Sequence, residues 1–223
     1  MNRGVMLASP LTLIALIKII TLFTALWAGV LAALVTAHAA TTTRPSLAAC
    51  WPAAVSNLPG MEERLLTEKL IGYDSSTPEG IRMCAGFVKG WLEARDIAAR
   101  QIGIRDLPVT IAEVGPEGGP TVLLHGHVDV VPGNDEQFEP RLEGEKLYGR
   151  GSYDMKGALA ALLLALTDLR DQDEVRVRLG IVPDEESEEE TERGGDLLVE
   201  EGFLGDFAIT GEPTDMHVGI AAK

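Results

Sequence analysis

Thr121-Val-Leu-Leu-His125-Gly-His127-Val-Asp129 combines an apolar run with two histidines and a carboxylate. The run is short, and a turn rich in glycine and proline precedes it at residues 115–120, which is typical of a buried β-strand. Because side chains alternate along a strand, His125, His127 and Asp129 share one face. A carboxylate two residues beyond an imidazole can accept a hydrogen bond from the ring nitrogen that faces away from a metal ion. The stretch therefore predicts a strand that delivers metal-binding groups, and the spacing leaves open which histidine is the ligand.

Further strands are predicted on both sides of this stretch. Residues 108–114 and 121–124 flank the turn at 115–120, which is the pattern of a β-hairpin whose second strand is buried. Residues 175–182 alternate like a half-buried strand, and residues 207–210 form a short apolar strand.

Helices are predicted between these strands. Apolar residues recur at helical spacing in 62–71, from 81 to about 95, in 156–169 and around 195–201. Strands that alternate with helices indicate an α/β fold, in which helices pack on a mixed sheet and the reactive groups lie along one sheet edge.

Three further motifs place carboxylates next to predicted strands or helices. Asp154 lies in Gly149-Arg-Gly-Ser-Tyr-Asp154-Met-Lys-Gly, and taken alone it would be interpreted as a helix N-cap. Pro183-Asp-Glu185-Glu186 follows the alternating strand, although both glutamates also fit the solvated acidic run at 184–192. Glu212 lies in Gly211-Glu212-Pro-Thr, where a simple turn acid is the alternative.

Imidazole nitrogens and carboxylate oxygens are the ligands that Zn²⁺ and similar cations accept. The candidates are separated by 27, 32 and 26 residues, so separate loops must converge on one point. A two-metal site needs a carboxylate that coordinates both ions at a separation of about 3.5–4 Å, and we assign this role to Asp154. Of Glu185 and Glu186, one would bind metal and the other would take a proton from the metal-held water. The set predicts a hydrolase with two divalent metal ions, with zinc favoured over cobalt or manganese.

In this order and at these intervals, the four motifs resemble the co-catalytic zinc family of acetylornithine deacetylase, succinyl-diaminopimelate desuccinylase, aminoacylase and glutamate carboxypeptidase. The resemblance covers roughly residues 65–223. It implies that the metal ligands are His127, Asp154, Glu186 and Glu212. It further implies that Glu185 is the general base, that Asp129 is the partner of His127, and that a non-proline cis peptide follows Asp154.

The resemblance also implies a reaction and an assembly. The substrate would be an N-acyl amino acid or a small peptide, whose amide carbonyl is polarised on a metal ion while Glu185 carries the proton to the leaving amine. Family members continue into a lid and dimerisation domain and then to a fifth, histidine ligand. Since the chain stops at Lys223, we expect an incomplete catalytic domain that is inactive alone, and a homodimer for the longer form. His217 is too close to Glu212 to replace the fifth ligand.

Residues 1–60 differ in composition from residues 61–223, which form the predicted catalytic portion. They contain no acidic residue, and residues 19–37 are an uncharged stretch that follows Arg3 and Lys18. This stretch predicts membrane contact, as an uncleaved anchor or a secretory signal, and hence an anchored or exported protein. The alternative is a spurious extension, with translation starting at Met61 and a cytoplasmic protein.

The charge excludes nucleic acid as a partner. All 34 acidic residues follow Gly60, where they outnumber the remaining 16 basic residues, so phosphates would be repelled. Cys50 and Cys84 are the only cysteines, which leaves no disulfide framework and favours free thiols. A membrane-tethered or exported metal-binding domain without catalysis is the competing hypothesis, but it gives Glu185 no role.

Overall fold

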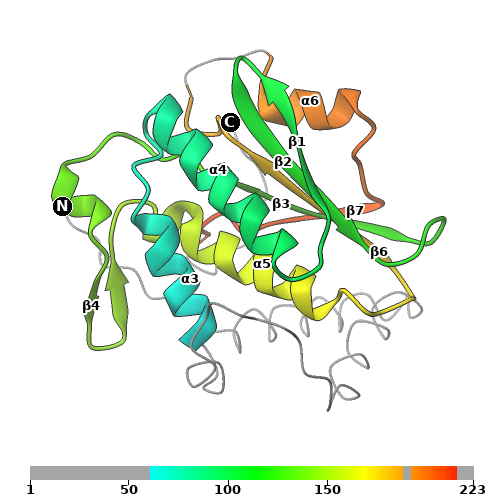
Figure 1. Cartoon of the computed structure of the whole chain (residues 1–223), viewed down its shortest axis with the longest axis horizontal. Helices are drawn as coiled ribbons and strands as arrows, with labels where there is room; N and C mark the ends of the chain where they lie inside the picture. Colours follow the sequence, from blue (N-terminus) through cyan, green and yellow to red (C-terminus); the bar gives the residue numbers. More distant parts are fainter. Residues whose placement is uncertain (1–60, 188–191, 215–223) are drawn as a thin grey trace.

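The computed structural model describes residues 61–187 and 192–214, and a five-stranded sheet lies at its centre (Figure 1). The α-helices are α3 (Met61–Ile71), α4 (Pro78–Glu93), α5 (Gly157–Asp168) and α6 (Gly194–Glu200), and the short helical turns are η3 (Asp135–Phe138) and η4 (Ser152–Lys156). The strands are β1 (Ala99–Ile104), β2 (Leu107–Val114), β3 (Thr121–His127), β4 (Arg141–Glu143), β5 (Lys146–Tyr148), β6 (Arg176–Val182) and β7 (Phe207–Thr210).

The sheet is mixed, with strand order β1-β2-β6-β3-β7. β6 is antiparallel to β2 but parallel to β3, which is parallel to β7. A separate two-stranded ribbon, β4–β5, extends from the rest (Figure 1). The expectation of an α/β fold with helices on a mixed sheet is confirmed.

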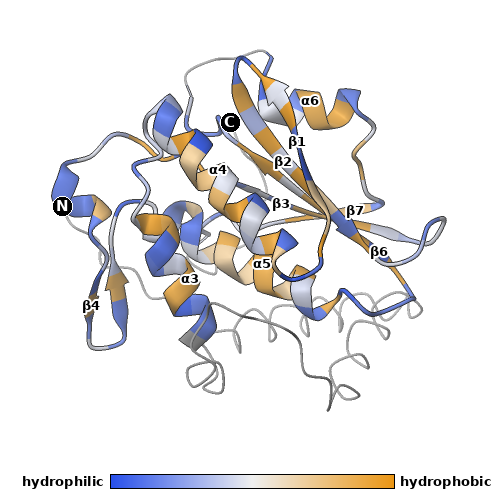
Figure 2. Cartoon of the chain, viewed as in Figure 1, coloured by the Kyte–Doolittle hydropathy of each residue, from blue (hydrophilic) through white to orange (hydrophobic). Residues whose placement is uncertain are grey.

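Helices pack on both faces of the sheet. The larger core lies between the sheet and α3, α4 and α5, and it includes Leu66, Val88, Leu124, Leu163 and Leu179. The smaller core joins the opposite face to α6, and it includes Ile111, Leu123, Val182, Leu198 and Phe203. Hydrophobic residues accordingly run along the strands and along α5 (Figure 2).

The predicted hairpin between residues 108–114 and 121–124 is wrong. β6 lies between β2 and β3 and pairs with both of them. The reason is that β6 alternates only at its start, whereas residues 179–182 are all buried. A strand that is apolar on both faces is stabilised at the centre of a sheet, with neighbours on each side.

Three of the described strands were not predicted from the sequence. β1 has mostly exposed or half-buried side chains, so it carries no apolar signal. It joins β2 through a tight turn in which Arg105 (φ 46°) and Asp106 (φ 62°) adopt left-handed conformations. β4 and β5 are three residues each, too short for a periodic pattern.

The predicted helices are confirmed, with small shifts at their ends. α4 begins earlier than expected, because Pro78 follows the N-cap Thr77, whose hydroxyl accepts a hydrogen bond from Gly80 N. The implied non-proline cis peptide is present between Asp154 and Met155. Cys84 is free and buried, as expected for a structural thiol.

In the two described ranges, no helix combines the length and hydropathy needed to cross a membrane. Residues 19–37, Cys50 and His217 lie outside those ranges, so the predictions made for them remain predictions.

Candidate metal centre

The carboxyl ends of three strands meet at one edge of the sheet. His127 ends β3 opposite Val182 of β6, and His125 lies opposite Thr210 of β7. Segments that follow parallel strands therefore emerge together, as expected for a site at a sheet edge. The loop before α5 adds Asp154 to this edge.

The structure brings His127, Asp154 and Glu212 together. His127 is fully buried, and its Nε2 lies 3.1 Å from Asp154 Oδ1 and 3.8 Å from Glu212 Oε1. One ligand atom from each residue lies within 4.8 Å of the others, which is close enough for a shared cation.

Asp129 connects the histidine to the segment that carries the two glutamates. His127 Nδ1 is 3.0 Å from the backbone oxygen of Asp129 and 3.3 Å from Oδ1. The other carboxylate oxygen, Oδ2, accepts a hydrogen bond of 2.8 Å from Glu186 N. When Nδ1 carries the proton, the lone pair of Nε2 faces the carboxylates. The expected pairing of Asp129 with His127 therefore includes the main-chain oxygen as well as the side chain.

The electrostatics of this edge favour a cation. Burial raises the pKa of Glu186 and Glu212, and the charge of Asp154 raises it further in both. Burial lowers the pKa of His127, but hydrogen bonds to Asp129 and Asp154 and the nearby carboxylates outweigh burial and raise it to about 10. Without a metal ion, the imidazolium is thus the positive charge that offsets the acids.

The donor set fits a divalent metal ion. It offers an imidazole nitrogen and carboxylate oxygens from separate loops, which are the donors that zinc accepts. Asp129 Oδ1 is buried and has no hydrogen-bond partner, and a proton held on Nδ1, 3.3 Å away, would complement its charge. His127, Asp154 and Glu212 are the residues whose donor atoms meet at this edge, and Glu186, predicted as a further ligand, is not in this group.

The remaining candidates are placed differently. The Glu185 side chain is exposed, while that of Glu186 is half-buried. His125 lines an apolar groove together with Leu198 of α6 and Ala208 of β7. Of the two histidines, His127 is the one whose ring nitrogen meets the carboxylates.

Sequence reasoning missed the residues that hold the glutamate segment in place. Asp184 is buried and binds Arg105, a residue 79 positions away. Arg193 donates to the backbone oxygens of Asp184 and Glu185. An aspartate at the start of an acidic run gave no local signal of burial.

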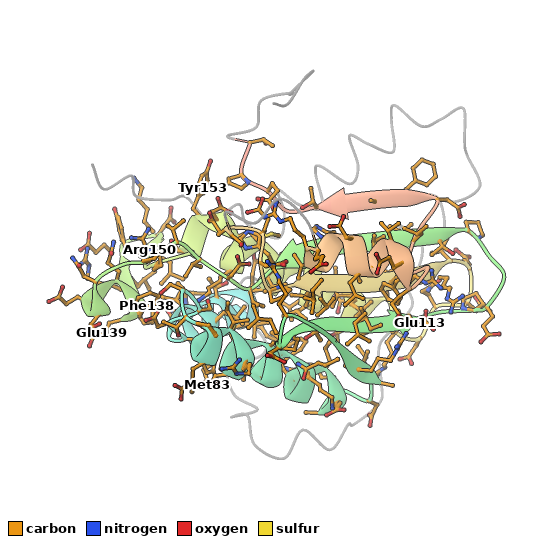
Figure 3. All side chains as sticks on the ribbon, turned by 90° about the horizontal axis from the view of Figure 1, so that it is seen from above. Met83, Glu113, Phe138, Glu139, Arg150 and Tyr153 are labelled. Carbon is orange, nitrogen blue, oxygen red and sulfur yellow. The ribbon has the colours of Figure 1, made fainter. Side chains whose placement is uncertain are left out.

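Figure 3 labels Tyr153, the sequence neighbour of Asp154, on the other side of the view from Glu113. The carboxylate of Glu113 accepts hydrogen bonds from Arg176 and Arg178.

Residues 123–223 match the model described as Peptidase family M20/M25/M40. This part of the chain belongs to that family. The chain is also 32% identical over 172 residues to a probable succinyl-diaminopimelate desuccinylase of Staphylococcus epidermidis, which covers 72% of this chain and 41% of the relative. Identity to the succinyl-diaminopimelate desuccinylase of Rhizorhabdus wittichii is 33% over 162 residues, or 68% of this chain and 42% of the relative.

Solved structures share the fold of this chain. The M20 family metallo-carboxypeptidase Sso-CP2 from Sulfolobus solfataricus is 26% identical with a TM-score of 0.58, over 67% of this chain and 37% of that one. Human carnosine dipeptidase 1 is 23% identical with a TM-score of 0.56, over 67% and 38% respectively, which supports the fold alone. The chain thus spans about two-fifths of the length of the relatives it matches.

Proposed function

We propose that this M20/M25/M40 chain is part of a metal-dependent hydrolase that cleaves the amide bond of N-acyl amino acids or small peptides. The names of its relatives support this reaction class, because they include desuccinylases and a metallo-carboxypeptidase. Among these substrates we favour N-acyl amino acids, since the relatives that are 32% and 33% identical to this chain are named as succinyl-diaminopimelate desuccinylases.

The observation that carries the proposal is the meeting of His127 Nε2 with the carboxylates of Asp154 and Glu212. We assign these three residues and Glu186 as ligands of two divalent metal ions, with zinc favoured. Asp154 is the bridging candidate, because its side chain is 44% exposed and can present both oxygens.

When bound, the ions would polarise the scissile carbonyl and lower the pKa of water toward about 7. The protein groups have separate tasks. Asp129 holds the proton on His127 Nδ1 and so leaves Nε2 free. Glu185, exposed at the edge, accepts a proton from water and transfers it to the departing amine.

Cobalt titration of the complete 223-residue chain tests the ligand assignment. We expect about two Co²⁺ to bind. Asp154→Ala should weaken binding by about 100-fold, because losing a direct ligand should cost at least as much as losing a residue that only supports a ligand. Asp173→Ala is the control, because Asp173 is an exposed acid on the loop before β6. Tight binding that Asp154→Ala leaves unchanged would contradict the assignment.

A further inference from the structure

We propose that the ion pair between Arg105 and Asp184 is a positioning device, which fixes the backbone of residues 183–187 so that Glu186 faces the metal cluster. The inference rests on the proposed function, because it takes Glu186 as a metal ligand. Arg105 is on the β1–β2 turn and is not itself one of the proposed ligands.

Asp184 is the point at which this segment is fixed. Its side chain is 3% exposed, and Arg105 Nη2 donates to Oδ2 at 2.5 Å. Gly194 N, at the start of α6, lies 2.9 Å from Oδ1 and 3.1 Å from Oδ2. A buried carboxylate held by a guanidinium and a backbone amide has little freedom to move.

The main chain around Asp184 is held as well. Arg193 Nη2 donates to Asp184 O at 2.8 Å and also to Glu185 O. On the far side of Glu185, the Glu186 amide binds Asp129 Oδ2 at 2.8 Å. Main-chain atoms of Asp184, Glu185 and Glu186 are therefore each held by a hydrogen bond.

The topology explains how a residue on the edge hairpin reaches this segment. β2 is antiparallel to β6, so the turn that precedes β2 lies at the sheet edge where β6 ends. Residues 105 and 106 both adopt left-handed conformations in that turn. Arg105 is consequently beside the segment that follows Val182.

The device matters because Glu185 and Glu186 lie outside any helix or strand. Their side-chain directions depend on the main chain of the segment, and a metal site is expected to keep its metal–ligand distances within about 0.2 Å of the usual values. Removing Arg105 would also leave the Asp184 charge buried without its partner, which favours movement of Asp184 toward water.

Cobalt binding to the complete chain tests the pair, with affinity and the visible absorption spectrum at saturation as readouts. We expect Arg105→Gln and Asp184→Asn each to weaken affinity by about 10- to 100-fold and to change the spectrum. Arg105→Lys, which keeps the charge, should recover part of the loss. Because the two residues contact each other, the loss in the double variant should be smaller than the sum of the losses in the two single variants.

Arg82→Gln is the matched control, since Arg82 donates to Asp106 O of the same turn at 3.3 Å. It should leave affinity and spectrum unchanged. If Arg105→Gln and Asp184→Asn both show the wild-type cobalt spectrum, the positioning role is overturned, whether or not their melting temperature is lower. A wild-type chain that binds no cobalt would instead overturn the proposed function itself, and the positioning role with it.

Discussion

His127 is buried among acids, and in the metal-free protein it is protonated at neutral pH because its pKa is about 10. A metal ion must displace that proton to reach Nε2. Binding of the ion and loss of the proton are therefore coupled, and affinity should rise with pH across the neutral range.

The same shift predicts how the metal-free protein responds to pH. The folded pKa of His127 is raised above its unfolded value of 6.5, so its contribution to stability is full below pH 6.5 and is lost as the pH rises toward 10. Between pH 6.5 and 8 the free energy of unfolding should fall by up to about 1.4 kcal/mol per pH unit. Urea unfolding in the presence of a chelator measures this slope.

Two variants test whether His127 is the histidine that causes this dependence of the free energy of unfolding on pH. His127→Gln should reduce the slope, whereas His125→Gln should retain it, because burial lowers the pKa of His125 and moves its titration below this window. The window stops at pH 8, where Lys156, whose pKa burial lowers to about 8, is half-titrated and opposes the fall. Glu63, whose pKa burial raises to about 7, adds the same fall to both variants in the lower part of the window. Equal slopes in both variants would contradict the assignment.

The candidate ligands could be predicted from sequence because each occurs in a short motif next to a strand or helix end. Asp184 and Arg105 could not, since their contact depends on the strand order. Periodicity gives the presence of β2 and β6, but not that β6 follows β2 in the sheet.

At the scale of elements, the hairpin was predicted wrongly for the same reason, which is that the sequence pattern does not give the order of the strands. A turn between two apolar runs is equally compatible with adjacent strands and with strands separated by a third. Here the buried second half of β6 decides, because burial on both faces requires neighbours on both sides. β1 shows the opposite problem, since an edge strand with exposed side chains has no pattern to detect.

Helix α4 allows a prediction at this scale. Gly86 is exposed in the middle of the helix, and a Cβ there would have no neighbour within 4 Å. Gly86→Ala should raise the free energy of unfolding by about 1 kcal/mol, because alanine loses less conformational freedom on folding. Denaturant unfolding measures the change.

Gly80 in the same helix provides the contrast. A Cβ at Gly80 would lie 1.7 Å from Asp74 O, so the turn before α4 would have to move. Gly80→Ala should therefore destabilise by about 1–3 kcal/mol. An equal effect at both glycines would show that the packing of α4 on that turn does not limit stability.

Across the described residues 61–187 and 192–214, the sheet gathers the proposed catalytic groups at one edge, where several of their side chains are exposed. Side chains of Asp154 and Glu212 are 44% and 35% exposed, and Glu185 is exposed as well. Water in such a site weakens the electrostatic interactions that stabilise a transition state.

We therefore expect the cobalt- or zinc-loaded 223-residue chain to hydrolyse N-acetyl and N-succinyl amino acids slowly, with kcat/KM well below about 10⁴ M⁻¹s⁻¹. Chromatographic assay of the released amine measures this rate. Any residual rate should disappear with a chelator and in Glu185→Gln, which removes the proposed base but none of the proposed ligands. Chelator-sensitive turnover in the ordinary enzyme range would contradict this prediction. It would show that the four ligands and Glu185 catalyse the reaction at full rate without exclusion of water.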